Sequence, residues 1–116
     1  MAVDIRPAQA LRLLHDFTDA LVTDDAPDLS ARQLAVLLTI YLDPPPHTVR
    51  GLAAKLGVTK PVITRALDSM GKLGLVSRRR DETDRRNVVI QRTVKGALAV
   101  ERLGDLLVAK ARALPR

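Results

Sequence analysis

The sequence predicts a mainly α-helical fold that carries one small β-hairpin. Its 116 residues suit one domain with its own core, spanning 1–116, and are too few for two such domains. Phe17 and Tyr41 are the only aromatic residues, so Leu, Val, Ile and Ala must build the core, which favours helices over a β-sandwich or barrel. Apolar residues recur at helical spacing along most of the chain and change to strand spacing only after Gly74.

Two helices are predicted in the first part of the chain. Pro7 suits the first turn of a helix that runs to about residue 23, because its ring fixes the backbone angle that a helix needs. A connector, residues 23–28, leads to a second helix that Ser30 caps and that Asp43 and three prolines end. The inward face of the second helix is predicted to consist of Leu34, Leu37, Leu38 and Tyr41.

The next segment predicts two helices joined by a tight turn. Thr48 caps a short third helix, and Gly57 fits the left-handed residue that ends one. Thr59 is a second cap, with Pro61 in the first turn of a fourth helix. This arrangement predicts a helix-turn-helix over about residues 48–73.

A hairpin and a last helix complete the predicted order of elements. The runs LVSRR and NVVIQ are β-prone and a polar loop separates them, which predicts a hairpin, or wing, over about residues 75–91. Its tip is the segment SRRRDETDRR, in which five arginines flank three acidic residues. The helical period returns for a terminal helix over residues 94–114. The whole order is that of a winged helix-turn-helix.

The positive charge is concentrated in this middle segment. Residues 1–47 carry 3 basic and 7 acidic side chains, residues 48–95 carry 12 and 4, and residues 96–116 carry 4 and 2, within a net charge of +6. A net charge of +8 over the middle segment is typical of a nucleic-acid binder, and the alternative is a solvated charged surface.

Other classes of function receive little support from the sequence. Without cysteine there is no disulfide or thiolate metal site, and His15 and His47 form no catalytic constellation, so we expect neither an enzyme nor a metal site nor a cofactor. The longest apolar run, Leu34–Leu42, is too short to span a membrane, so a cytoplasmic protein is expected.

Residues 29–96 resemble the MarR family of bacterial transcriptional regulators. The resemblance rests on LSARQLAVLLTI, on LAAKLGVTKPVITRALDSM, on GLVSRR, on the pair Asp84 and Arg86, and on RTVKG. It implies a repressor or activator, with repression favoured, that binds a palindromic operator in double-stranded DNA as a homodimer. It also implies that the fourth helix enters the major groove and the wing the minor groove, and it leaves room for an unidentified small-molecule effector.

The predicted DNA contacts come from the fourth helix and the wing. Arg suits a bidentate contact with guanine, whereas Lys is a point charge suited to phosphate. The resemblance assigns entry into the minor groove to Arg86 and the orientation of Arg86 to Asp84. The full set of predicted contacts is Thr59, Lys60, Pro61, Thr64, Arg65, Arg78, Arg80, Arg85 and Arg86. An ordinary amphipathic surface helix and a solvated charged turn are the alternatives.

Dimer contacts are expected from the terminal helices, residues 7–23 and 94–114. The expected residues are leucines without an evident partner: Leu11, Leu14, Leu98, Leu103, Leu106 and Leu107. Only about twenty residues follow the wing, where regulators of this family continue into two long helices, so we expect a smaller or differently built dimer, or a monomer. The alternative function is a winged-helix adaptor that binds another protein rather than specific DNA.

Overall fold

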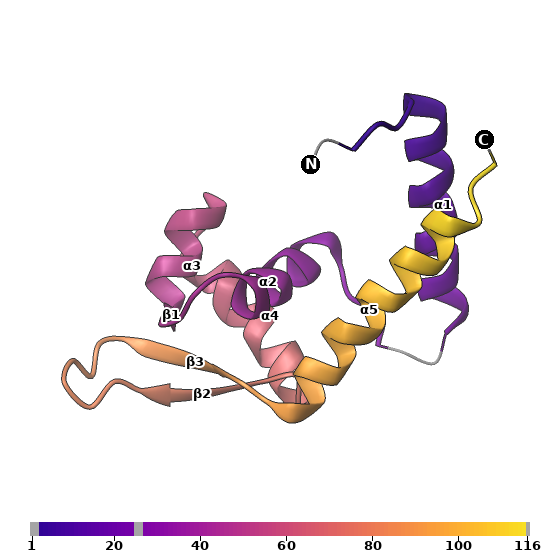
Figure 1. The fold of residues 1–116 in the computed structure, drawn as a ribbon. Coiled ribbons are helices and arrows are strands. Elements are labelled where there is room, and N and C mark those ends of the chain that lie inside the picture. The colour runs from indigo at the N-terminus through magenta and orange to yellow at the C-terminus, as the bar shows by residue number, and fades with distance from the viewer. Residues whose placement is uncertain (1–2, 25–26, 116) are drawn as a thin grey trace. The chain divides into compact units, whose positions relative to one another are not determined.

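A computed structural model describes residues 3–24 and 27–115 of the chain. These residues form five helices and three short strands, which confirms the predicted winged helix-turn-helix (Figure 1). Residues 25–26 of the predicted connector lie outside the described residues. The elements are α1 (Pro7–Thr23), α2 (Ala31–Leu42), β1 (His47–Thr48), α3 (Val49–Leu56), α4 (Lys60–Lys72), β2 (Val76–Arg80), β3 (Val88–Arg92) and α5 (Val94–Arg112).

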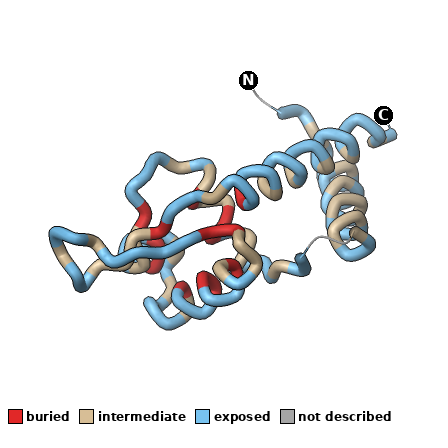
Figure 2. The backbone as a smooth tube through the Cα atoms, turned by 90° about the horizontal axis from the view of Figure 1, so that it is seen from below, coloured by how far each residue is buried: buried red, intermediate tan, exposed pale blue. Residues whose placement is uncertain are grey.

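The chain divides into two compact units, residues 29–100 and residues 1–28 with 101–116. The first unit holds the hydrophobic core, which is aliphatic as the composition predicts (Figure 2). Its members come from α2, α3, α4, the sheet and the bend before β2: Val36, Leu37, Ile40, Leu52, Ala53, Ile63, Ala66, Leu67, Met70, Leu75, Val76 and Ile90.

The start of α2 forms as predicted, but its inward face does not. The Ser30 hydroxyl accepts a hydrogen bond from the Gln33 amide N–H, and the Gln33 side-chain oxygen accepts one from the Ser30 N–H, so both residues cap the helix. The buried residues of α2 are Val36, Leu37 and Ile40, so only one of the four predicted core residues is fully buried. Leu34, Leu38 and Tyr41 are half-buried instead, because the helix is apolar on most sides and the packing against α4 selects the face.

The helix-turn-helix follows the local sequence signals. The Thr48 hydroxyl accepts a hydrogen bond of 2.9 Å from the Gly51 N–H, and Gly57 has φ of 66°, as the predicted cap and left-handed residue require. Thr59 occupies the N-cap position of α4 without a capping bond from its side chain, and Pro61 lies in the first turn. The buried residues of α4 lie on one face of the helix: Ile63, Ala66, Leu67 and Met70.

The wing is part of a three-stranded antiparallel sheet of order β1-β3-β2. Strands β2 and β3 form the predicted hairpin, from Val76 opposite Arg92 to Arg80 opposite Val88. Strand β1, which the sequence did not predict, pairs His47 with Ile90 and Thr48 with Val89. Two residues are too few to show alternation, so only the fold reveals β1, which joins the start of α3 to the wing.

The second unit consists of α1 and the last part of α5. Helix α1 has the predicted bounds, and none of its residues is buried. Leu11 and Leu14 are 68% and 58% exposed, and Leu107 of α5 is 42% exposed. An ion pair of 2.8 Å links Arg102 to Asp24. This unit therefore presents apolar side chains to solvent and has little core of its own. None of the described helices is long and apolar enough to cross a membrane.

Candidate nucleic-acid interface

The exposed face of α4 carries the predicted contacts of that helix. Lys60, Pro61, Thr64 and Arg65 are all exposed, as is Thr59 at the N-cap. The opposite face of α4 is buried in the core, so these side chains share one solvent-facing surface. Such a surface offers hydroxyl, ammonium and guanidinium donors to base edges and phosphates.

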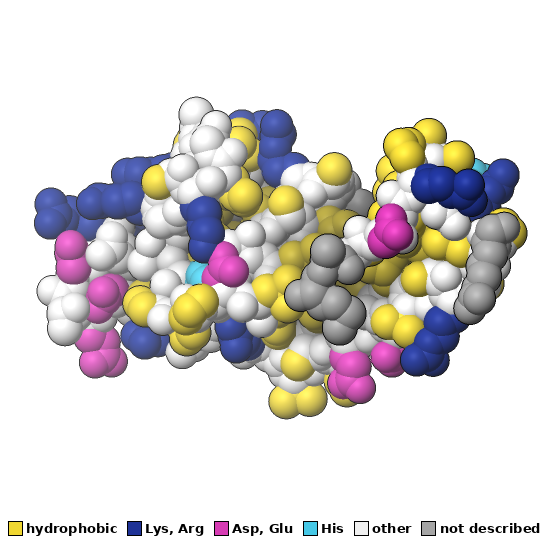
Figure 3. All heavy atoms as spheres, turned by 45° about the horizontal axis from the view of Figure 1, so that its top comes forward, with side chains coloured by type: hydrophobic (Ala, Val, Ile, Leu, Met, Phe, Trp, Pro, Cys, Tyr) yellow, Lys and Arg dark blue, Asp and Glu magenta, His cyan; other side chains and the backbone are white. Residues whose placement is uncertain are grey.

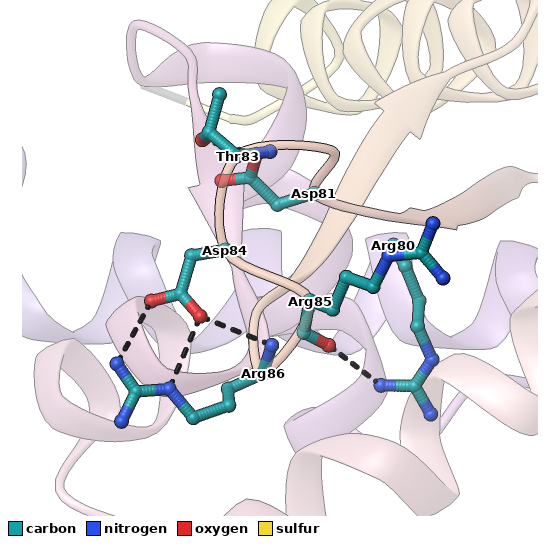
Figure 4. A network of polar contacts seen from close by, with 6 residues as sticks. All are labelled: Arg80, Asp81, Thr83, Asp84, Arg85 and Arg86. Carbon is teal, nitrogen blue, oxygen red and sulfur yellow. Dashed lines mark hydrogen bonds and ion pairs between the residues drawn. The ribbon is translucent and has the colours of Figure 1, made fainter.

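The tip of the wing is held by its acidic residues (Figure 4). The Asp81 carboxylate accepts hydrogen bonds from the Thr83 hydroxyl at 2.7 Å and from the Thr83 N–H at 2.9 Å, which lower the pKa of Asp81. Across the loop, the Arg80 guanidinium donates to the Arg85 carbonyl oxygen at 2.9 Å. The carboxylates thus shape the loop as well as offset its positive charge.

Asp84 and Arg86 form a two-pronged ion pair (Figure 4). Nε of Arg86 lies 3.1 Å from Oδ1 of Asp84 and its second guanidinium nitrogen lies 3.3 Å from Oδ2, while the Arg86 N–H also donates to Oδ1. These bonds from Arg86 lower the pKa of Asp84. The Arg86 side chain remains 82% exposed, so the ion pair does not cover it.

Arg50 is a cation near this pair that the sequence did not single out. Its charge also lowers the pKa of Asp84, after the larger effect of Arg86. Arg50 is exposed in the first turn of α3, directly after the strand that pairs with the wing. The β1 pairing brings it to the wing, so no local sequence signal could have shown this.

Arg78 differs from the other predicted wing contacts. Its guanidinium lies 2.8 Å from the Asp68 carboxylate of α4, and its side chain is only 32% exposed. Arg80 lies two residues further along β2 and therefore on the same side of the strand. The structure thus joins the base of the wing to α4 through Arg78 and leaves Arg86 as the most exposed arginine of the ion pairs.

Lys and Arg side chains gather over the end of the 29–100 unit that carries the β2–β3 loop, with acidic side chains beside them (Figure 3). The expected dimer leucines fall into two groups. Leu98, in the 29–100 unit, is 61% exposed, and the others lie in the second unit, where Leu103 and Leu106 are half-buried. Within the described residues, no group of three or more His, Asp or Glu side chains is placed to hold a metal ion.

A helix-turn-helix with an exposed basic helix and an arginine-tipped hairpin defines a winged-helix protein. Residues 28–87 match the model of the MarR family, and the chain belongs to that family. No curated protein shows significant sequence similarity to the chain.

Solved structures share this fold. The transcriptional repressor CouR, bound to a 23-mer DNA duplex, is 27% identical with a TM-score of 0.72, over 90% of this chain and 71% of that one. A mutant MarR from E. coli complexed with operator DNA is 25% identical with a TM-score of 0.68, over 90% and 69%. A mutant MepR from S. aureus is 19% identical with a TM-score of 0.74, over 94% and 81%, a likeness of fold alone.

Proposed function

We propose that the protein is a sequence-specific transcriptional regulator that binds double-stranded DNA and acts as a repressor. The observation that carries the proposal is the pairing of an exposed basic face on α4 with the oriented Arg86 of the wing, in a member of the MarR family. Two similar proteins, CouR and the E. coli MarR, have been solved with DNA.

Helix α4 would read the major groove. Arg65 is suited to a bidentate contact with guanine O6 and N7, and Thr64 to a base edge or a phosphate. Lys60 and Thr59, at the start of α4, would contact phosphates and set the position of the helix. Pro61 would pack against the sugar-phosphate backbone.

The wing would enter the adjacent minor groove. Arg86 would lie in the groove, where negative potential is strongest over narrow A·T-rich segments. Asp84 would hold the guanidinium in that direction through the observed ion pair. Arg80 and Arg85 would contact the flanking phosphates.

A homodimer would present two such domains to a palindromic operator. The exposed apolar side chains of α1 and α5 are the surface that we propose for the dimer, because none of the described residues of the second unit is fully buried in a single copy. Two half-sites bound together gain affinity that one domain cannot reach. Sedimentation at micromolar concentration should give the mass of two chains, and a sharp monomer peak would contradict this part of the proposal.

Fluorescence anisotropy against the DNA that flanks the protein's own gene tests the function. Each phosphate contact contributes about −0.9 to the log-log slope of affinity on salt, so about four contacts per subunit give a steep decline. A duplex of scrambled sequence is the control and should bind more weakly. Absence of binding at low salt, or binding that ignores ionic strength, would instead support a protein-binding adaptor.

A further inference from the structure

A groove lies between the first turn of α2 and the exposed side of α4. It has a volume of about 210 Å³ and includes Arg65, the residue proposed to contact a base. The other lining residues are Ser30, Arg32, Gln33, Val62, Ala66 and Ser69. The groove therefore extends the surface of α4 sideways, onto a helix that the sequence assigned only to the core.

The charged side chains of this groove are both positive. Arg32 and Arg65 are exposed, and the lining contains no carboxylate. Among the described residues, no Asp or Glu forms an ion pair with either arginine, whereas Arg78 and Arg86 each have one. Arg32 is also one of only 3 basic residues among the first 47 and the only one of them within the 29–100 unit.

The capping bonds of α2 leave hydrogen-bond donors in the groove. The Ser30 hydroxyl oxygen and the Gln33 side-chain oxygen accept bonds from backbone N–H groups of the same turn. Each oxygen thus accepts one bond from the helix itself, while among the described residues the hydroxyl proton of Ser30 and the side-chain NH₂ of Gln33 donate no hydrogen bond and lie alongside the guanidinium of Arg32. A surface of donors without a carboxylate suits an oxyanion, and Arg in particular suits the paired oxygens of a phosphate.

We propose that this groove binds a phosphate of the DNA backbone beside the bases that α4 reads, with Arg32 as its principal contact. The proposal rests on the proposed function. DNA is the source of the phosphate because the groove is open to solvent and continuous with Arg65, so a duplex seated on α4 passes over it. As a phosphate contact, Arg32 contributes affinity without sequence preference.

Arg32→Ala in the full-length chain tests the proposal. Anisotropy titrations with the gene-flanking duplex and with its scrambled control, at several salt concentrations, should show weaker binding to both duplexes. The log-log salt slope should become shallower by about 0.9 per subunit, since one phosphate contact is lost. Arg32→Lys, which keeps a point charge, should restore most of the slope.

Lys95→Ala is the matched control, because it removes one positive charge from an exposed residue of the same unit. Lys95 lies beside Gly74, which follows the C-terminal end of α4, whereas Lys60 begins the helix. It should leave the slope unchanged. Equal slopes for Arg32→Ala and the parent, or an equal change for Lys95→Ala, would overturn the proposal, provided that the parent binds DNA. No DNA binding by the parent would instead refute the function itself.

Two further measurements identify the ligand and check the fold. DNA binding by the parent and by Arg32→Ala is measured in inorganic phosphate and in chloride at the same ionic strength. Replacing chloride with phosphate should weaken DNA binding by the two proteins to the same extent. A strong effect of phosphate on the parent alone would assign the groove to a free anion. Because Arg32 is exposed and has no ion-pair partner among the described residues, its substitution should leave the melting temperature of the protein unchanged.

Discussion

Gly96→Ala should destabilise the packing of the first turn of α5 against Tyr41 and Leu75. A Cβ at this position would lie 1.8 Å from the Tyr41 hydroxyl oxygen and 2.1 Å from the Leu75 carbonyl oxygen. The Tyr41 hydroxyl donates to that carbonyl at 2.7 Å and accepts from the Thr93 N–H at 3.0 Å. An alanine must therefore displace the phenol and leave its part-buried partners without their hydrogen bonds.

The magnitude follows from these contacts. Overpacking of a core costs about 1–3 kcal/mol. Each polar group left without its partner costs about 1–3 kcal/mol more. With one overpacked site and two polar groups left unpaired, the free energy of unfolding should fall by at least about 3 kcal/mol. At about 4–8 °C per kcal/mol for a small domain, this lowers the melting temperature by more than about 12 °C.

Gly104→Ala provides the internal control. It lies on the same helix, and a Cβ there meets nothing within 4 Å. Alanine should stabilise this site by about 0.5–1 kcal/mol, because glycine costs conformational entropy in a helix. Thermal unfolding followed by circular dichroism compares the two variants, and emission from Tyr41, the only tyrosine of a chain without tryptophan, reports on the packing around Gly96. If both substitutions shifted the melting temperature in the same direction, the reasoning would be refuted.

Four further predictions concern DNA binding, measured by anisotropy at one fixed salt concentration with the fold checked by circular dichroism. Arg65→Ala should cost about 1–3 kcal/mol and relax the preference at one base position, whereas Arg86→Ala should reduce affinity mainly on A·T-rich flanks; identical losses on all sequences would contradict the division. Asp84→Asn should weaken binding although it makes the protein more positive, because the guanidinium of Arg86 loses its partner; equal or tighter binding would refute the orienting role. Because the pKa of Asp84 is lowered, its carboxylate stays charged above the usual pKa of an aspartate, and the ion pair with Arg86 is lost only as the pH falls through the lowered pKa. DNA affinity should therefore not change through Asp84 between about pH 8 and about pH 5. Arg78→Ala and Asp68→Asn should have similar effects on binding if their ion pair braces the wing, and only the Arg78 variant should lose affinity if Arg78 contacts DNA directly.

The parts of the fold that depend on neighbouring residues were predictable from the sequence. Thr48 caps α3, Gly57 takes the left-handed conformation and Pro61 lies in the first turn of α4, because each effect acts within one turn of the chain. The buried face of α4 was also predictable, since its apolar residues occupy one side only. On α2 the apolar residues surround the helix, so packing against α4 decided that Val36 and Ile40 face inward.

The parts that depend on distant residues were not predictable. Arg50 approaches the wing only because β1 pairs with β3. Arg32 lies in a groove with Arg65 only because α2 packs against α4. In the sequence, each is an isolated arginine without a motif. Charge per segment indicated a nucleic-acid binder but did not show which cations share a surface.

The charge of the basic segment overstates how many of its arginines are available to DNA. Arg92 donates to the carbonyl oxygens of Ile40 and Asp43, so it holds the end of α2. Arg78 is paired with α4 and one nitrogen of Arg80 is bound to the loop backbone. The acidic residues among the arginines also hold the hairpin, because Asp81 binds Thr83 and Asp84 binds Arg86. They convert part of a repulsive cluster into a braced hairpin, and Arg86, which remains 82% exposed, is ion-paired with Asp84. A wing that attracted DNA only by its net charge would need neither the Arg78–Asp68 ion pair nor Asp84. Asp68→Asn and Asp84→Asn therefore distinguish an oriented arginine contact from attraction by net charge.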